Sequence, residues 1–415
     1  MTAERWRWLR RAIGAGTRRA WGVGAVALLA GCEERLTAPA DCPALCPGGG
    51  APVLDTVIEA SPNLDSTFVG YFVRWQGASL RVSHQFPLSE DRAYIKFIPR
   101  PDSLPLRDTL RVYSIDSVAL ELSLQARDTL VPGLKVFLYR MPIGFDSTTP
   151  FGEIDQRMVT ANLIDSIVVP DTLKSGRLRA LLTGEELDRV AIPPADSGRL
   201  AIAVGITAAA PTGIRIASQT TSALPQFLTY ARFDVADTSL QRRTISRSPE
   251  FNTFVSASVV PRDPSLLTVG GDSGARSIVR FQVPPAIRDS TTIVRATLEL
   301  TPVAPFQGIP NDPPLLAARA LLADLGAKSP LVDARLILLA DSLPLGTPGP
   351  VRHDVTRIVR TWAQPGGLPS AVLLSLSPET GSFTQAVFAS TRSPDPSARP
   401  RLRISYVRRF PFERP

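Results

Sequence analysis

The sequence predicts an all-β protein that consists of two tandem β-sandwich domains, each with one short capping helix. Three observations support this prediction. The chain contains 39 prolines in 415 residues, and proline removes a backbone donor and interrupts long helices. Short alternating or β-branched runs bounded by Pro, Gly, Asp or Ser occur throughout the sequence. Several of these runs also recur in the same order in the two halves of the chain.

The clearest predicted strands lie in both halves of the chain. They are RAYIKF (92–97), SVALELSL (117–124), LKVFLYR (134–140), RLAIAVGI (199–206), SIVRFQV (277–283) and PRLRISYV (400–407). Six segments of the first half match segments of the second half in order. The matched pairs are 55–61 with 252–258, 79–82 with 266–269, 92–97 with 276–281, 118–122 with 296–300, 214–218 with 386–390, and 227–232 with 402–407. We interpret this order as a tandem duplication, with domains over 53–240 and 250–415; coincidence among generic strands is the alternative.

One short helix is predicted in each half. Residues 183–190 begin with Thr183 and carry Glu186 three positions later, which is a capping-box pattern. In 354–362, apolar residues at i, i+3, i+4 and i+7 form one face, and Asp354 can accept the free amides of the first turn. Such helices can close an open end of a sandwich, and we expect Trp362 to be a core residue.

The amino-terminal residues 1–31 have the features of an export signal. Six arginines precede a short apolar run from Trp21 to Ala30, which is too short to span a bilayer as a stable helix. The sequence Leu29-Ala30-Gly31-Cys32 resembles the lipobox of bacterial lipoproteins. This resemblance implies diacylglycerol on the sulfur of Cys32, a third acyl chain on its amine, and a lipid anchor in the cell envelope. Glu33 follows where an inner-membrane retention signal usually has Asp, so the outer membrane is favoured. An ordinary cleaved signal or a buried helix is the alternative.

Residues 32–52 are expected to form a flexible linker behind the acylated cysteine, because they are rich in Pro, Gly and Ala. Cys42 and Cys46 lie in this linker, and in an oxidising compartment they could form a small-loop disulfide or remain free thiols. Removal of 1–31 would also reduce the formal charge from +8 to +3, because that segment carries six Arg and one Glu. We therefore expect no nucleic-acid partner.

The second half resembles a known domain family. An RSxVRF strand, an ATLEL strand, the DVTxxVxxW helix, an AVFAS strand and a closing RPRLRISY strand follow one another. This order resembles the DNRLRE-type domain, also classed with carbohydrate-binding modules of the CBM96 type, over 250–409 and more loosely over 53–235. The resemblance implies a jelly-roll-like sandwich on an exported bacterial protein, with polysaccharide as a candidate ligand. Exposed aromatic rings often stack on sugars, so Tyr71 and Trp75, with Phe72 between them, are the candidate ligand-binding residues; packing within the fold is the alternative.

Residues typical of catalysis are scarce in the sequence. Gly271-Asp272-Ser273-Gly274 resembles the nucleophile segment of chymotrypsin-like proteases, but His84 and His353 lack the context and order of that family. We interpret the segment as a turn between two strands. His353-Asp354 could be half of a catalytic or metal site, but we expect Asp354 to cap the helix and His353 to lie at the surface or a strand end.

No metal site is predicted, since the chain has only three Cys and two His. Calcium binding at Asp-rich turns, such as those of Asp263, Asp272 and Asp289, is an alternative that the sequence neither specifies nor excludes. The sequence therefore favours a non-catalytic envelope lipoprotein that binds or attaches to a surface, with polysaccharide as one candidate. The alternatives are a structural lipoprotein that acts through protein contacts and, less favoured, a hydrolase.

Overall fold

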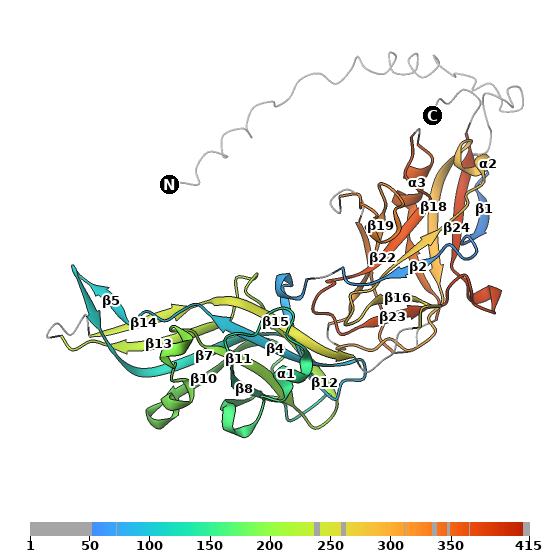
Figure 1. Ribbon diagram of the computed structural model, residues 1–415. Helices are drawn as coiled ribbons and strands as arrows, with labels where there is room; N and C mark the ends of the chain where they lie inside the picture. The colour runs from blue at the N-terminus through green and yellow to red at the C-terminus, as the bar shows by residue number, and fades with distance from the viewer. Residues whose placement is uncertain are drawn as a thin grey trace, which may run out of the picture. The chain divides into compact units, whose positions relative to one another are not determined.

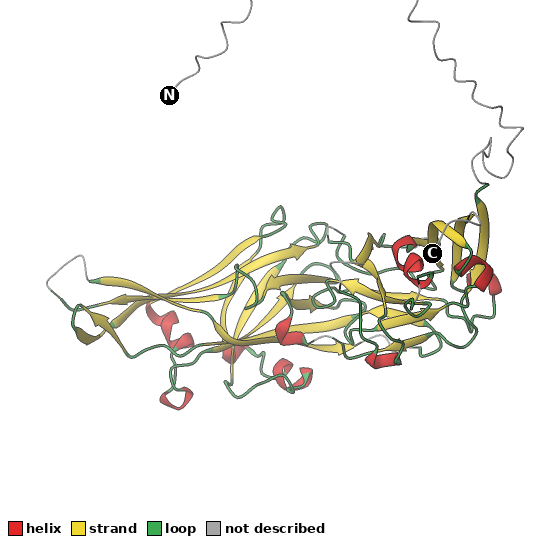
Figure 2. Ribbon diagram, turned by 90° about the horizontal axis from the view of Figure 1, so that it is seen from above, coloured by secondary structure: helices red, strands yellow, loops and turns green. Residues whose placement is uncertain are grey.

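The protein folds into antiparallel β-sheets that form two sandwiches, as the sequence predicts (Figures 1 and 2). The computed structural model describes residues 52–71, 73–235, 241–258, 263–310, 312–333, 338–346, 349–364 and 366–409. Residues Val53–Pro415 form one unit. We call the sandwich built from β3 to β15 the first sandwich, and the one built from β1, β2 and β16 to β24 the second sandwich.

The first sandwich has two antiparallel sheets in which most neighbouring strands are not consecutive in the chain. One sheet has the order β14-β13-β7-β12-β3, with β10 also paired to β7, and the other has the order β15-β4-β11-β8-β9. The bounds are β3 Ser79–His84, β4 Ser89–Phe97, β7 Ser114–Arg127, β8 Lys135–Met141, β9 Leu163–Val168, β10 Gly176–Thr183, β11 Ala201–Thr207, β12 Thr212–Ala217, β13 Gln226–Arg232, β14 Arg242–Arg247 and β15 Pro249–Ser258. Strand β10 alternates buried and exposed residues, which places Leu178, Ala180 and Leu182 in the core. A hairpin of β5 (Ser103–Leu106) and β6 (Thr109–Val112) extends this sandwich.

The second sandwich repeats this plan with shorter strands. Its sheets have the orders β1-β24-β18-β21 and β2-β17-β22-β19-β20, and β16 pairs with β23. The bounds are β1 Leu54–Glu59, β2 Ser66–Phe68, β16 Leu267–Gly270, β17 Arg276–Arg280, β18 Thr291–Leu300, β19 Leu315–Ala320, β20 Leu338–Ser342, β21 Val351–Asp354, β22 Ala371–Ser377, β23 Gln385–Phe388 and β24 Arg401–Arg408. Its core includes Leu298, Leu374, Phe388 and Ile404, which come from four different strands, and Phe281, which follows β17 directly.

The two sandwiches share their strand pairings residue by residue. Five of the six matched pairs of segments also face equivalent partners; the exception is 55–61 with 252–258, because the first pairs with β24 and the second with β4. Leu80 faces Ile216 as Leu267 faces Phe388, Leu120 faces Phe227 as Leu298 faces Leu402, and Ile95 faces Ile202 as Val279 faces Val372. Because register is set by many independent side chains, this agreement supports the interpretation of the chain as a tandem duplication.

The predicted domain boundaries at 53–240 and 250–415 need correction, because two segments lie in the other sandwich. Strand β1 pairs with β24 and β2 pairs with β17, so residues 54–68 complete the second sandwich. Strand β14 pairs with β13 and β15 pairs with β4, so 242–258 completes the first sandwich. The two segments occupy corresponding places, since Ala60 faces Phe281 as Pro249 faces Phe97. Each half of the sequence thus supplies its first two strands to the other half.

The predicted short helices occupy corresponding places in the two sandwiches. The 3-10 helix η4 (Gly184–Val190) follows β10 and has the Thr183–Glu186 capping box, and helix α3 (Thr356–Trp362) follows β21. Trp362 is buried and its ring stacks on Phe281 with 6.3 Å between centroids, which confirms it as a core residue. Two further short helices, α1 (Phe151–Asp155) and α2 (Pro285–Arg288), were not expected.

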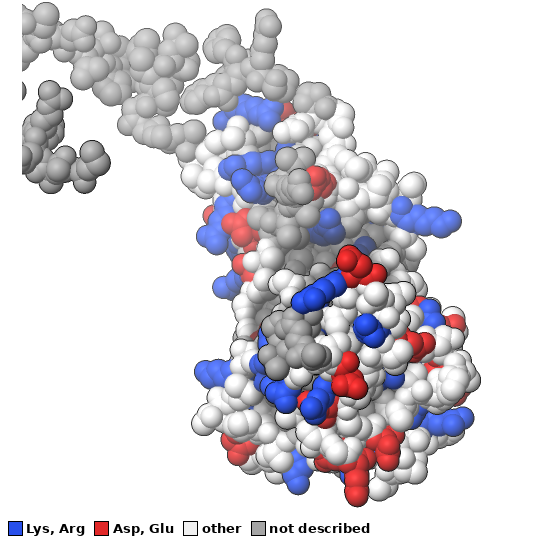
Figure 3. Space-filling view, turned by 90° about the vertical axis from the view of Figure 1, so that its left-hand side faces the viewer, with Lys and Arg blue, Asp and Glu red and all other residues white. Residues whose placement is uncertain are grey.

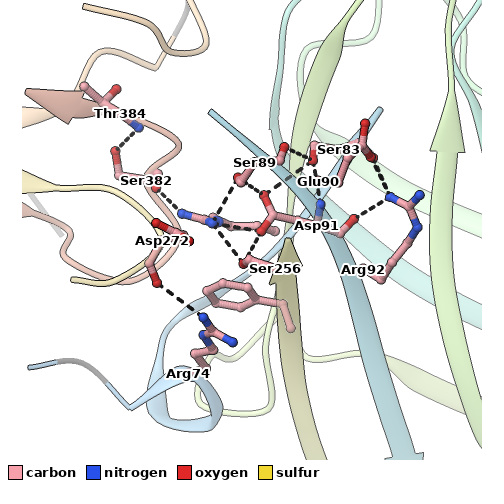
Figure 4. A network of polar contacts seen from close by, with 12 residues as sticks. Arg74, Ser83, Ser89, Glu90, Asp91, Arg92, Ser256, Asp272, Ser382 and Thr384 are labelled. Atoms are coloured by element: carbon pink, nitrogen blue, oxygen red, sulfur yellow. Dashed lines mark hydrogen bonds and ion pairs between the residues drawn. The ribbon is translucent and has the colours of Figure 1, made fainter. Parts of the chain in front are cut away.

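A buried polar network lies where the sandwiches meet (Figure 4). Arg81 of β3 forms an ion pair with Asp91 of β4 and donates a hydrogen bond from Nη1 to the carbonyl of Ser382, 2.8 Å away in the second sandwich. Nearby, Arg215 pairs with Asp312 at 2.7 Å, and the rings of Phe86 and Phe383 lie 5.1 Å apart. Charged, aromatic and backbone contacts therefore hold the two sandwiches together.

Candidate functional site

A groove lies on the outer face of one sheet of the second sandwich, beside the connector between β2 and β3. It has a volume of about 340 Å³. Most of the side chains that line it are polar, and they come from the connector, from β19 and from β22 and the turn that follows it. Those used below are Gln76, Arg319, Ser375, Ser377, Glu379 and Thr380. We call this hollow the connector groove.

The alternation of the strands explains why these polar side chains face outward. In β19, Leu316, Ala318 and Ala320 belong to the core, so Arg319 lies on the opposite face. In β22, Leu374 and its alternate neighbours belong to the core, so Ser375 faces outward. The connector then covers this face closely: a Cβ added to Gly77 would lie 2.6 Å from Oγ1 of Thr380. Glycine at position 77 therefore permits the close approach that forms the groove.

Arg319 brings a hydrogen-bond donor without a described partner to the connector groove. Its Nε is buried and has no hydrogen-bond partner among the residues that the structure describes. Burial lowers the pKa of Arg319, and the nearby guanidinium of Arg276 adds to this effect. Arg276 itself is bound by Glu379 through two contacts of 2.6 Å. A buried donor without a partner is costly, so Arg319 is suited to bind an acceptor from a ligand.

The two predicted ligand-binding aromatics both lie on the connector, but in different settings. Tyr71 packs under Arg276, with 4.4 Å between its ring centroid and the guanidinium carbon, and its hydroxyl donates to the carbonyl of Ala327 at 2.5 Å. Burial raises the pKa of Tyr71. Trp75 lies in the single turn η2 (Arg74–Gln76) and is 37% exposed, so its ring is open to a ligand. Phe72 lies outside the described residues.

Arg74 fixes the connector beside the groove (Figure 4). Its Nη2 donates to the carbonyl of Asp272 at 3.3 Å, and its guanidinium lies 5.5 Å from the ring centroid of Phe254. Burial lowers the pKa of Arg74, with a smaller contribution from the neighbouring Arg81. Trp75 and Gln76 are thus carried by a turn whose first residue is held by both sandwiches.

The Gly271-Asp272-Ser273-Gly274 segment is a turn between β16 and β17, as interpreted from the sequence. Gly270 and Ala275 pair across it, and the carbonyl of Ser273 accepts a hydrogen bond from the amide of Gly70 at 2.8 Å. Gly270, Gly271 and Gly274 all have positive φ angles of 57° to 79°, which favour glycine. The segment therefore has a structural role in holding the connector.

His353 is in a different environment from the one expected. It is completely buried in β21, and its Nδ1 lies 2.7 Å from a carboxylate oxygen of Asp341, so the prediction of a surface or strand-end position is wrong. The four-residue strand places alternate residues inward, and His353 faces the core side together with Val351. The carboxylate of Asp354 accepts a hydrogen bond from the amide of Thr356 at 2.9 Å, which confirms its capping role. His84 ends β3, opposite Thr212.

The Asp-rich turns use their carboxylates locally. Asp263 accepts hydrogen bonds from the amide and hydroxyl of Ser265, and Asp289 binds Arg288; these hydrogen bonds lower the pKa of both carboxyls. Asp272 lies in the turn described above. Within the described ranges, no three His, Cys, Asp or Glu side chains lie where they could hold a metal ion together.

Sequence reasoning found the connector aromatics but missed Arg319 and Glu379. A signal for Arg319 is present, because it is the one charged residue in the strand LLAARA. A single charged residue in an otherwise apolar strand indicates that its side chain points away from the core, toward polar groups. Glu379 had no comparable signal, since its role depends on the non-local approach of Arg276.

The cysteines singled out in the sequence, Cys32, Cys42 and Cys46, lie outside the described residues. Among the helices that the structure describes, none has the length and hydrophobicity needed to cross a membrane. No protein-family model matches the chain, and no curated protein matches it significantly. On the face shown in Figure 3, basic and acidic side chains are interspersed.

Proposed function

We propose that the protein is a non-catalytic, lipid-anchored envelope protein that binds polysaccharide in the connector groove. The observation that carries this proposal is the unsatisfied Nε of Arg319 in a polar groove, and the exposed ring of Trp75 adds support because it adjoins Gln76, which lines that groove. Sugars present hydroxyl acceptors to a guanidinium and a C–H face to an aromatic ring. The groove is open and shallow, which suits a segment of an extended chain.

The binding proposal is tested with the full chain on an array of bacterial and plant polysaccharides. We expect binding to at least one polysaccharide. Arg319→Ala and Trp75→Ala should each weaken it about tenfold or more, which corresponds to roughly 1.4 kcal/mol. The matched controls are Arg157→Ala and Leu322→Ala, which change exposed residues outside the groove. Binding that is unchanged by Arg319→Ala and Trp75→Ala would contradict the assignment to this groove.

The anchor is proposed from the lipobox-like sequence that ends at Cys32. We expect Cys32→Ala to move the protein from the membrane fraction to the soluble fraction, because acyl chains contribute about 0.8 kcal/mol for each buried methylene. Mass spectrometry of the amino-terminal peptide provides the direct readout. The outer membrane is the proposed location, and Cys42 and Cys46 are proposed to form a disulfide or to remain free thiols. Bare Cys32 in the mature protein would contradict the anchor.

A structural role through protein contacts is the second candidate function. The observation that favours it is the β5–β6 hairpin, in which Leu110 is 72% exposed and Val112 is 79% exposed. Exposed aliphatic side chains that lie close together can mark a contact surface. Co-purification of a defined envelope protein that is lost with Leu110→Ser/Val112→Ser, together with no polysaccharide binding, would favour this candidate.

A further inference from the structure

A second polar hollow lies on the outer face of the other sheet of the second sandwich. It has a volume of about 560 Å³, and every residue that lines it is polar or charged. The residues used here are Arg295, Glu299, Asp341, Arg352, Asp354 and Arg403, from β18, β20, β21 and β24. Because the two sheets enclose one core, this hollow and the connector groove lie on opposite faces of the second sandwich. We call it the Glu299 hollow.

The floor of the hollow is the carboxylate of Glu299, whose side chain is only 9% exposed. Three arginines surround it: Arg352 at 3.4 Å, Arg401 at 3.6 Å and Arg403 at 3.5 Å. None of these contacts has hydrogen-bond geometry, and no other described residue donates to this carboxylate. Buried carboxylates normally accept hydrogen bonds, so Glu299 has unused acceptor capacity directed at the hollow.

The walls of the hollow offer donors in reach of the same space. The side chains of Arg352 and Arg403 are 71% and 52% exposed, and Arg295 is also exposed. Three arginines and the three carboxylates of Glu299, Asp341 and Asp354 line the hollow, so its formal charge is balanced. A ligand that fits this lining must both donate and accept hydrogen bonds without a net charge. Sugar hydroxyl groups meet both requirements.

The first sandwich provides a comparison at the corresponding position. Glu121 follows Leu120 in β7 as Glu299 follows Leu298 in β18, and its side chain is 10% exposed. It lies 3.2 Å from Arg177 and 3.6 Å from Arg179. The hollow next to this cluster is lined by Tyr230 and Arg242 and not by Glu121. Glu121 is therefore a matched control: it is a buried Glu among arginines that does not line the hollow next to it.

We propose that the Glu299 hollow is a second ligand site, which binds the hydroxyl groups of a neutral polysaccharide. Glu299 accepts from the sugar, and Arg352 and Arg403 donate to it. Together with the connector groove, this site allows one molecule to link two glycan chains on opposite faces of the second sandwich. The inference rests on the proposed polysaccharide-binding function and adds to it a second site and a cross-linking role.

The test is isothermal titration of the full chain with cellohexaose, xylohexaose, laminarihexaose and mannohexaose. We expect two sites for the sugar that binds. Glu299→Gln should weaken one of them about tenfold or more, while Glu121→Gln should weaken neither. If Glu299→Gln does not fold, Arg295→Ala tests the same hollow instead. It removes an exposed side chain that lines the hollow, and it should weaken the same site. Arg319→Ala should weaken only the other site.

The outcomes separate this inference from the proposed function. Loss of all binding with Arg319→Ala, and no change with either Glu299→Gln or Arg295→Ala, would overturn the second site and keep the connector groove. Loss with Glu299→Gln and no change with Arg319→Ala would overturn the groove and keep the Glu299 hollow. No heat of binding for any of the four sugars would overturn the hollow as a neutral-sugar site, and the polysaccharide array would then decide the groove separately.

Discussion

Arg81 and Asp91 form an ion pair of 2.8 Å, and their side chains are only 1% and 0% exposed. The guanidinium lies between the rings of Phe254 and Phe383, at 4.9 and 5.2 Å from their centroids. Phe254 belongs to the first sandwich and Phe383 to the second, so one buried cation contacts both. The pair therefore joins the two sandwiches as well as two strands.

We expect Arg81→Met to lower the free energy of unfolding by about 3–5 kcal/mol, because Asp91 would stay buried without its partner. Chemical denaturation measures this loss. The double variant Arg81→Met/Asp91→Leu should recover part of it, since it removes both charges. An equal loss in the single and double variants would show that the packing of Arg81, rather than its charge, is the main contribution.

Arg247 is buried to the same degree, yet the effect of its removal should be the opposite. Burial, with a contribution from Arg100, lowers its pKa to about 9. Its Nε and Nη2 have no partner among the described residues, and its guanidinium lies 4.0 Å from the ring centroid of Phe227. Since the charged form is disfavoured by burial at neutral pH, Arg247→Met should leave the free energy of unfolding unchanged or raise it.

The same denaturation experiment checks Arg247→Met. Its Nη1 donates to the carbonyls of Ile98 and Gly198 at 3.3 and 3.1 Å. A loss of more than about 2 kcal/mol would show that these two hydrogen bonds outweigh the burial of the charge.

The ion pair of Arg280 and Asp324 predicts a pH dependence of stability. Two contacts of 2.5 and 2.7 Å join these side chains, and the hydrogen bonds from Arg280 hold the pKa of Asp324 below its ordinary value of 3.8. A lowered folded pKa stabilises the protein above the unfolded pKa, and this contribution is lost as the pH falls through the folded value.

We therefore expect Asp324→Asn to cost up to about 1 kcal/mol at pH 7, and this difference from the unmodified chain should shrink as the pH falls below the ordinary value of 3.8. Thermal or urea unfolding at several pH values measures it. Asp108→Asn, in an exposed turn, is the control and should show no such difference. A difference between Asp324→Asn and the unmodified chain that is constant from pH 7 to pH 2 would contradict this origin.

Each half of the sequence supplies its first two strands to the sandwich of the other half, and this strand exchange predicts which fragments fold. Residues 70–258 contain every strand of the first sandwich, so this fragment should unfold cooperatively by circular dichroism. The fragment 53–240 lacks β14 and β15 and carries β1 and β2 without their partners, so it should show no cooperative transition. Cooperative unfolding of 53–240 with equal stability would contradict the exchange.

Local features of the fold could be predicted from the sequence, because they depend on neighbouring residues. The capping box of Thr183 and Glu186, the cap by Asp354 and the alternation in β4 each follow from a few adjacent positions. The exchange of strands between the two sandwiches could not be predicted. The alternation of a strand shows which side chains face a core, but it does not show whether that core belongs to the first or the second sandwich. DTVIEAS (55–61) and NTFVSAS (252–258) have similar patterns, and each pairs in the sandwich of the other half.

The candidate site was predictable to a similar extent. Tyr71 and Trp75 stood out as aromatic residues close together in the sequence, and both lie on the connector. Only Trp75 is open, because Arg276 and Ala327, distant in the sequence, occupy the ring and the hydroxyl of Tyr71. Arg319 and Glu299 could not be assigned to hollows, since strand register and the placement of the connector decide which outward residues share a space.

The contact between Asp55 and Ser405 has a consequence for how the chain is made. Oδ1 of Asp55 accepts a hydrogen bond of 2.5 Å from a hydroxyl that lies 350 positions later. During synthesis, β1 therefore emerges long before β24, the strand with which it pairs. Contacts of such long range form slowly. The second sandwich can close only after β24 has left the ribosome, so β1 stays without this partner while all the strands between the two are translated.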